Sequence, residues 1–390
     1  MIYLDYNATT PLGAAAREAM EPFLARHYGN PSSVHGAGRE ARAAVDDARD
    51  RLADLLGAKP HELIFTSSGT ESNNLAVLGL ARAQAERGRH LICASTEHHA
   101  VLNAFEHLAE REGFDVTFLG VDEMGRIDLD ELAGVIRADT TLVSIMTANN
   151  ETGVLQPMTE LARLCDERGV LLHTDMVQSF GKVEIDLAGS NLAAASFAAH
   201  KFYGPKGAGL LYLRAGIPIE PIQFGGAHEN QRRPGTENVP AIVGMAGAAE
   251  FVLRDRAEEQ GRQAILRDTL WEKIIAACPD AIQNGDGAPR LANTLNVSFP
   301  ALSSETLLMA LDLEGICASS GSACMVGSVV ASHVLLAMGL AAELAGAAVR
   351  FSLGRETTDD EIDRAGEIIG RVIHRVRSAG TESRVAYAAV

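Results

Sequence analysis

Residues 170–213 contain three short apolar runs and read VLLHTDMVQSFGKVEIDLAGSNLAAASFAAHKFYGPKGAGLLYL. Each run has the length and composition of a buried β-strand. Asp175 closes the first run, and Lys201 follows the second. Because open α/β sheets bind their ligands at strand ends, this stretch is expected to carry part of a binding site.

Four further strand-like runs precede this stretch, and most are separated by segments of helix length. The seven runs cover residues 62–67, 90–95, 114–119, 141–146, 170–175, 191–198 and 208–213. This alternation predicts an α/β fold with a mainly parallel, doubly wound sheet. Beyond about residue 240, a long helical stretch and the runs 293–299 and 347–354 predict a smaller α+β domain.

Length and charge limit the classes of partner. The chain has 390 residues, which suggests two domains, and a formal charge of -17 with a pI near 5.1. Such a charge argues against binding to nucleic acid or to an anionic membrane surface, and favours a small molecule or a protein partner. The longest apolar stretch, residues 241–253, is too short to span a bilayer and contains Glu250.

Cysteine usage and the N-terminal sequence indicate the compartment. The five cysteines form no CxxC pair, and their odd number cannot all pair within one chain. The first residues enter a β-like run without the basic and apolar regions of a secretory signal. We therefore expect a reduced, cytoplasmic protein.

Lysine is rare here, because only five of the 34 basic residues are lysines. An amine can form an imine with a carbonyl cofactor, which a guanidinium cannot do. Lys201 comes directly after an apolar run and His200, whereas Lys206 lies in GPKG, a composition typical of a turn. An Asp at one strand end and a Lys after the next strand suit pyridoxal phosphate enzymes, in which the carboxylate pairs with the ring nitrogen. By itself, Asp175 could equally be a loop carboxylate that caps the next turn.

Two more segments are candidates for chemistry. In FTSSGTESNNLA (65–76) a strand leads into a helix, whose N-terminal amides and small hydroxyl residues suit a phosphate. Taken alone, this motif is better explained as an ordinary helix cap. In CASSGSACMVGS (317–328), glycine and serine surround Cys324, which is typical of a loop where a thiol can act as a nucleophile or be incidental.

Ten motifs together closely resemble the cysteine desulfurases, which are pyridoxal phosphate enzymes of the class V aminotransferase family. They are YLDYNATTP (3–11), YGNPSSVHGAGREA (28–41), FTSSGTESNNLA, STEHHAV (95–101), SIMTANNETGVLQP (144–157), HTDMVQS (173–179), HKFYGPKG (200–207), GGAHENQRRPGTENV (225–239), SSGSAC (319–324) and VRFSLGR (349–355). Any one could arise by chance, but ten in family order extend the resemblance almost from end to end.

The resemblance implies a fold and a division into domains. It implies the type I fold of pyridoxal phosphate-dependent transferases, with a mainly parallel seven-stranded sheet in the large domain. We expect the large, cofactor-binding domain at residues 15–255. Residues 1–14 and 256–390 are expected to form the small domain, with the catalytic cysteine loop at about 318–332.

The resemblance also assigns roles at the cofactor. Lys201 should form the internal imine, Asp175 should pair with the pyridine nitrogen, and Gln178 should bond the phenolic oxygen. His98 should stack on the ring and transfer protons, while His99 is expected to be structural. The phosphate should be held by Gly69, Thr70, His200 and Thr236. Thr236 is expected to reach the site of a partner subunit, which implies a homodimer.

For the substrate, the resemblance implies that Arg350 clamps the carboxylate of L-cysteine, assisted by Asn150, which also contacts the cofactor. The Cys324 thiolate should attack the substrate sulfur, giving alanine and a persulfide on Cys324. That sulfur would pass to an acceptor protein, for iron–sulfur cluster assembly or another sulfur-transfer pathway. No metal site is expected.

Three positions depart from the family pattern. Ala198 replaces a serine whose hydroxyl normally helps to hold the phosphate, which removes about 1.5–3 kcal/mol unless another donor substitutes. Met176 replaces a common alanine, and the segment after Cys324 is unusually apolar. Other readings are a different class V enzyme, such as a selenocysteine lyase or an aminotransferase, and a non-catalytic sulfur-relay scaffold.

Overall fold

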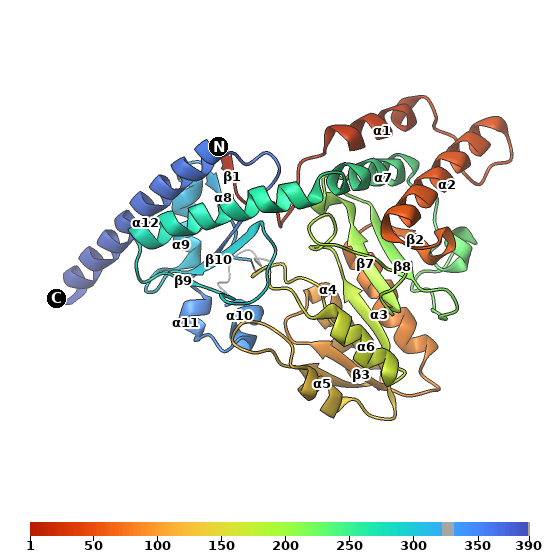
Figure 1. Cartoon of the computed structure of the whole chain (residues 1–390), viewed down its shortest axis with the longest axis horizontal. Coiled ribbons are helices and arrows are strands. Elements are labelled where there is room, and N and C mark those ends of the chain that lie inside the picture. Colours follow the sequence, from red (N-terminus) through yellow and green to blue (C-terminus); the bar gives the residue numbers. More distant parts are fainter. Residues whose placement is uncertain (322–330, 389–390) are drawn as a thin grey trace.

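The computed structural model describes residues 1–321 and 331–388 (Figure 1). Its large sheet has the strand order β2-β8-β7-β6-β5-β3-β4. The strands are β2 (Leu63–Thr66), β3 (His90–Ala94), β4 (Asp115–Leu119), β5 (Thr140–Ser144), β6 (Leu171–Asp175), β7 (Ala194–Ala198) and β8 (Gly209–Leu213). All seven predicted strands are therefore confirmed, as is the mainly parallel sheet. Only β8 runs antiparallel to its neighbours, β7 and β2.

Alternate side chains of the strands face two separate layers of helices. On β8, Leu210 and Tyr212 belong to the apolar cluster that also contains residues of α2 (Gly36–Leu56), α6 (Met158–Glu167) and α7 (Val239–Leu253). Leu211 and Leu213 belong to the cluster with residues of α3 (Gly69–Ala83) and α4 (His99–Glu112). The period-two pattern of each strand thus buries both faces of the sheet.

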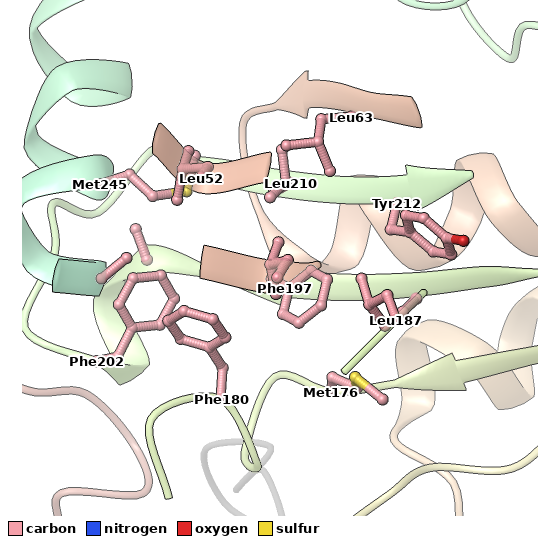
Figure 2. Close-up of a cluster of buried hydrophobic side chains, with 14 of the residues drawn as sticks. Leu52, Leu63, Met176, Phe180, Leu187, Phe197, Phe202, Leu210, Tyr212 and Met245 are labelled. Atoms are coloured by element: carbon pink, nitrogen blue, oxygen red, sulfur yellow. The ribbon is translucent and has the colours of Figure 1, made fainter. Parts of the chain in front are cut away.

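Met176, one of the departures from the family pattern, lies in the first of these clusters. Figure 2 shows it beside the sheet in the same cluster as Phe180, Leu187 and Phe197. Its side chain is buried, and its main-chain N–H donates to the carbonyl of Ser196. The methionine therefore fills apolar space in the core, as its flexible thioether allows.

The smaller part of the chain is α+β, as predicted. In it β10 (Thr294–Ser298) lies between β9 (Ile282–Gln283) and β12 (Ala348–Ser352), antiparallel to both. The helices α8 (Arg256–Ala277), α9 (Ser304–Leu313) and α12 (Asp359–Ala388) cover this sheet, and α8 leads into it from α7 (Figure 1).

The N-terminal residues join this smaller part. The strand β1 (Ile2–Tyr3) pairs with β11 (Ile316–Cys317), and Ile2 and Leu4 pack in one cluster with residues of α8, α9 and α12. The helix α1 (Ala14–Ala25) packs instead against α7 of the larger part. This packing supports domain boundaries near residues 15 and 255, which stay a prediction.

Neither a membrane span nor a metal cluster is present among residues 1–321 and 331–388. No helix among them is long and apolar enough to cross a membrane. Within the same ranges, no group of three or more His, Cys, Asp or Glu side chains could hold a metal ion.

Candidate active site

A cavity of about 520 Å³, called the central cavity below, lies between the strand ends of the large sheet and Arg350 on β12. It brings together nine of the residues predicted from the sequence. They are Gly69, Thr70, His98, Asn150, Asp175, Gln178, His200, Lys201 and Arg350. Thr236 does not line the cavity; it is exposed in the loop before α7. Cys324 lies outside the described residues.

Lys201 ends a short 3-10 turn, Ala199–Lys201, that directly follows β7. Its Nζ donates to the carbonyl oxygens of Asn7 (2.6 Å) and Ala8 (2.8 Å). The pKa of this amine is lowered to about 8, mainly by burial and also by the charge of Arg350, against the opposing effect of Asp175. Near neutral pH, far more of Lys201 is therefore a free, nucleophilic amine than for an exposed lysine.

The N-terminal segment holds this lysine turn in place. The main-chain N–H and the hydroxyl of Thr10 both donate to the carbonyl of His200, at 2.9 and 3.0 Å. The carbonyl of Asn7 accepts from Gln178 Nε2 (2.9 Å) as well as from Lys201. Residues 7–10, which follow β1, thus cross the base of the cavity, and we call them the strap. Their sequence alone did not reveal this role.

Asp175 ends β6 and points its carboxylate into the cavity wall. Its Oδ1 accepts from the main-chain N–H of Val177 (2.8 Å), and its Oδ2 accepts from Asn73 Nδ2 (2.6 Å) on α3. Nearby Glu97 is fully buried, and burial, with a further contribution from Asp175, raises its pKa well above the ordinary value. Burial thus favours the protonated form of Glu97 at this wall.

His98 caps the N-terminus of α4. Its Nδ1 accepts from the main-chain N–H of Ala100 (3.0 Å), so the other ring nitrogen carries the proton of the neutral imidazole. Burial lowers the pKa of His98, and Lys201 and the neighbouring histidines lower it further although Asp175 opposes them. A neutral imidazole at a cavity wall can give or take a proton. His99 also lines the cavity, with its ring 4.7 Å from that of His333.

The N-terminus of α3 opens onto the same cavity. Ser68 is its cap, and the hydroxyl oxygen accepts from the main-chain N–H of Glu71 (3.1 Å), so the hydroxyl proton remains available to a ligand. Position 69 must be glycine, because a Cβ there would lie 2.8 Å from Val177 Cγ2 and 3.2 Å from Ala198 Cβ. Free amides and two hydroxyl residues, Ser68 and Thr70, therefore face the cavity where an anion would bind.

His200 lies beside this helix end as a neutral ring. Its Nδ1 is 3.1 Å from the hydroxyl of Thr9. Burial lowers its pKa to about 4, with smaller contributions from Lys201 and Lys206. His200 can therefore offer a hydrogen bond to an anion, but it adds no charge.

Arg350 closes the opposite side of the cavity. It is only 3% exposed, and its Nη2 pairs with Asp5 Oδ1 at 2.7 Å while Nη1 donates to the carbonyl of Asn150 at 2.9 Å. Its Nε is buried and has no hydrogen-bond partner among the described residues. A planar donor that lines the cavity and is held in place by Asp5 and Asn150 suits a carboxylate ligand.

The described residues on both sides of Cys324 border the cavity. Ser319 and Gly321 line it, and Ser319 exchanges main-chain hydrogen bonds with Arg350. After the gap, Ser332 Oγ donates to Glu151 Oε2 (2.5 Å), and Glu151 also lines the cavity. The described residues that precede and follow Cys324 therefore lie at the edge of this site.

Several residues at the site were missed from the sequence. Asn7 accepts hydrogen bonds from Gln178 and Lys201 through its carbonyl oxygen. Asn73 donates to Asp175, and Asp5 pairs with Arg350. Lys182 contacts Gln178. These residues lie in the motifs of the resemblance or beside them, but their partners are far apart along the chain, so spacing gave no signal for the contacts.

Comparisons with known proteins agree with this geometry. A family model described as aminotransferase class-V matches residues 2–365. The chain is 44% identical over 377 residues to the cysteine desulfurase IscS of Dictyoglomus turgidum, covering 97% of this chain and 95% of that protein. A solved structure of a NifS-like protein has a TM-score of 0.90 at 38% identity, covering 96% of this chain and 99% of that one. Another, described as SspA in complex with cysteine, has a TM-score of 0.81 at 37% identity, covering 90% and 99%.

Proposed function

Because the chain belongs to the class-V aminotransferase family and, within it, to the cysteine desulfurases, we propose that the protein removes the sulfur of L-cysteine in its central cavity, using the residues described above. The observation that carries this proposal is the convergence of Lys201, Asp175 and Arg350 on one cavity. An amine, a carboxylate and a fixed guanidinium are three of the groups that the reaction needs at defined places.

Members of this family depend on pyridoxal 5′-phosphate, and the donor set of the cavity fits that group. The Lys201 amine would hold its aldehyde, Asp175 its ring nitrogen and Gln178 its phenolic oxygen. The helix end at Gly69 and Thr70, with Ser68 and His200, would hold the phosphate. His98 would stack on the ring, and Asn150 would lie at its edge. When bound, the cofactor supplies a protonated ring that withdraws electrons from the substrate.

The protein's own groups then act in sequence. Arg350, which lines the cavity, binds the substrate carboxylate and so orients the amino group toward Lys201. Lys201 and His98 move protons at the substrate carbons, for which their lowered pKa values suit them. The Cys324 thiolate attacks the substrate sulfur, so that an S–S bond forms as the C–S bond breaks. The products are L-alanine and a persulfide on Cys324.

We propose that the protein acts as a homodimer in the cytoplasm. Thr236 supports the dimer, because it is exposed and lies outside the cavity of its own chain, so its expected contact with a phosphate requires a second subunit. The persulfide would pass to an acceptor protein for iron–sulfur cluster assembly or another sulfur-transfer pathway. The relatives named IscS support the first of these.

The direct test is turnover of L-cysteine by the purified protein with pyridoxal phosphate. We expect alanine to form, and Cys324→Ala to abolish alanine production from L-cysteine while the visible absorption of the bound cofactor persists. A selenocysteine lyase or an aminotransferase does not need Cys324 in this way. Alanine formation that survives its loss would therefore contradict the proposed role of this thiol.

Cofactor uptake is expected to depend on pH through Lys201. Only the neutral amine attacks an aldehyde, and the pKa of Lys201 is lowered from 10.5 to about 8. The rate of uptake by apoprotein should rise about tenfold per pH unit below this value and level off above it. Stopped-flow absorbance measures this rate. A rate that keeps rising to pH 10 would mean an unperturbed amine.

Restoring the missing hydroxyl should tighten cofactor binding. Ala198 lines the cavity beside Ser68, so Ala198→Ser places a second hydroxyl at the phosphate end. A hydrogen bond to a charged group predicts an affinity about tenfold to a hundredfold higher. Equilibrium dialysis of pyridoxal phosphate measures it, with Ser67→Ala as the control because Ser67 is exposed and outside the cavity. Unchanged affinity would show that Ser68 and water already satisfy the phosphate.

A further inference from the structure

A second lysine, Lys182, lies behind the central cavity. Its Nζ donates to Gln178 Oε1 (3.1 Å) and to Asn7 Oδ1 (3.4 Å). It is one of only five lysines in the chain, and it is part-buried, in contrast to exposed Lys206. None of the roles assigned above uses this amine, although both of its acceptors belong to the cavity wall.

The contact with Lys182 decides which way the Gln178 amide points. Gln178 Nε2 donates to the main-chain carbonyl of Asn7 at 2.9 Å, and its Oε1 accepts from Lys182. Reversing the amide would place an oxygen against the Asn7 carbonyl and an NH₂ group against an amine. The contact with Asn7 would then have no donor, and the contact with Lys182 would have no acceptor while the amine is protonated, so the observed orientation is the favoured one.

This orientation places the Gln178 amino group next to the reactive lysine. The carbonyl of Asn7 that accepts from Gln178 also accepts from Lys201 Nζ (2.6 Å). An amide nitrogen carries two hydrogens, and the contact with Asn7 uses one. The second remains for a ligand in the cavity.

We propose that Lys182 is a positioning residue, which keeps Gln178 a hydrogen-bond donor to the phenolic oxygen of the cofactor. The inference rests on the proposed function of the cavity. Lys182 touches neither cofactor nor substrate and acts through Gln178.

The electrostatic surroundings agree with such a role. Lys182 faces the charges of Lys201 and Arg350, and it shares a small cavity of about 30 Å³ with Arg256, Glu259 and Arg355. Its pKa is lowered to about 7, mainly by burial and also by those two cations. An ammonium and a neutral amine both carry N–H groups, so the contact with Gln178 persists in either state.

The test is a pH titration of the visible absorption of the bound cofactor, which requires no turnover. The protonated imine is stabilised by a hydrogen bond to the phenolic oxygen of the cofactor. A second donor to that oxygen weakens this bond, so it lowers the pH at which the imine loses its proton and the visible band changes. Lys182→Met removes the N–H group that donates to Gln178, with little change in side-chain size, so Gln178 should no longer be held as a donor to the cofactor. The pH of the titration should then rise by about one unit, which corresponds to the loss of one hydrogen bond. Lys206→Met, a change to an exposed lysine, is the matched control and should leave it unchanged.

A double variant separates positioning from a direct effect. In a Gln178→Leu background, Lys182→Met should cause no further shift, because the residue through which it acts is gone. An equal shift in that background, or no shift in the single variant, overturns the proposal. If Lys182→Met does not fold, Lys182→Arg keeps a donor and must titrate within about 0.3 unit of the wild type. A wild-type protein without a visible band would instead overturn the proposed function itself.

Discussion

Replacing Lys201 by alanine is expected to lower the turnover of L-cysteine at least about 10⁴-fold. In the proposed mechanism, the variant loses both the amine that holds the cofactor and the group that moves protons at the substrate. No other described lysine can substitute, since Lys182 is engaged with Gln178 and Asn7. Alanine production measured by chromatography gives the rate, and the visible band of the cofactor should also disappear or shift.

Lys206→Ala is the matched control for this variant. Lys206 lies five residues on, in the same motif, but it is exposed and outside the central cavity. Its activity should stay within about twofold of the wild type, as is usual for surface substitutions. Added methylamine should restore part of the activity of Lys201→Ala, because a free amine can enter the vacated space. Activity of Lys201→Ala near the wild-type level would remove the basis of the mechanism.

The second large effect is expected for Asp175→Asn. An amide keeps the shape of the side chain. Its oxygen can still accept from the main-chain N–H of Val177, and its NH₂ group can donate to Asn73 once the Asn73 amide turns its oxygen toward it, but the amide has no charge to hold a proton on the cofactor ring. A carboxylate partner shifts a pKa by about one to three units, so kcat should fall roughly tenfold to a thousandfold. Because the proposed contact of the substrate carboxylate is with Arg350 and not with Asp175, KM should change little.

The control for Asp175→Asn is Asp128→Asn. Asp128 is an exposed cap of the helix Leu129–Val135, and it lies outside the central cavity. Its loss should leave kcat unchanged. A kcat for Asp175→Asn within about twofold of the wild type would mean that the ring nitrogen does not need this charge.

The sequence predicted the strands well, because each is a short apolar run bounded by turns. It could not give their order in the sheet or the reversed direction of β8, since these depend on which strands hydrogen-bond to each other. An apolar run has the same length and composition whether its strand pairs in parallel or antiparallel with its neighbours. Periodicity therefore identified the elements, whereas topology required the structure.

The site was predicted unevenly for a similar reason. Lys201 and Asp175 could be placed near each other because each follows a strand, and strand ends meet at one edge of a sheet. Asn7 and Asp5 could not, because their partners Lys201 and Arg350 are distant in sequence. Cys324 and its apolar neighbours lie outside the described residues, and Thr236 is exposed, so their roles stay predictions.

A single-turnover reaction without reductant tests the central claim most directly. Holoprotein is mixed with a limiting amount of L-cysteine, and alanine is counted against persulfide located by mass spectrometry of peptides. We predict one alanine for each persulfide, with the additional sulfur on the peptide that contains Cys324. Alanine without sulfur on that peptide, or pyruvate in place of alanine, would contradict the proposed transfer from L-cysteine to Cys324.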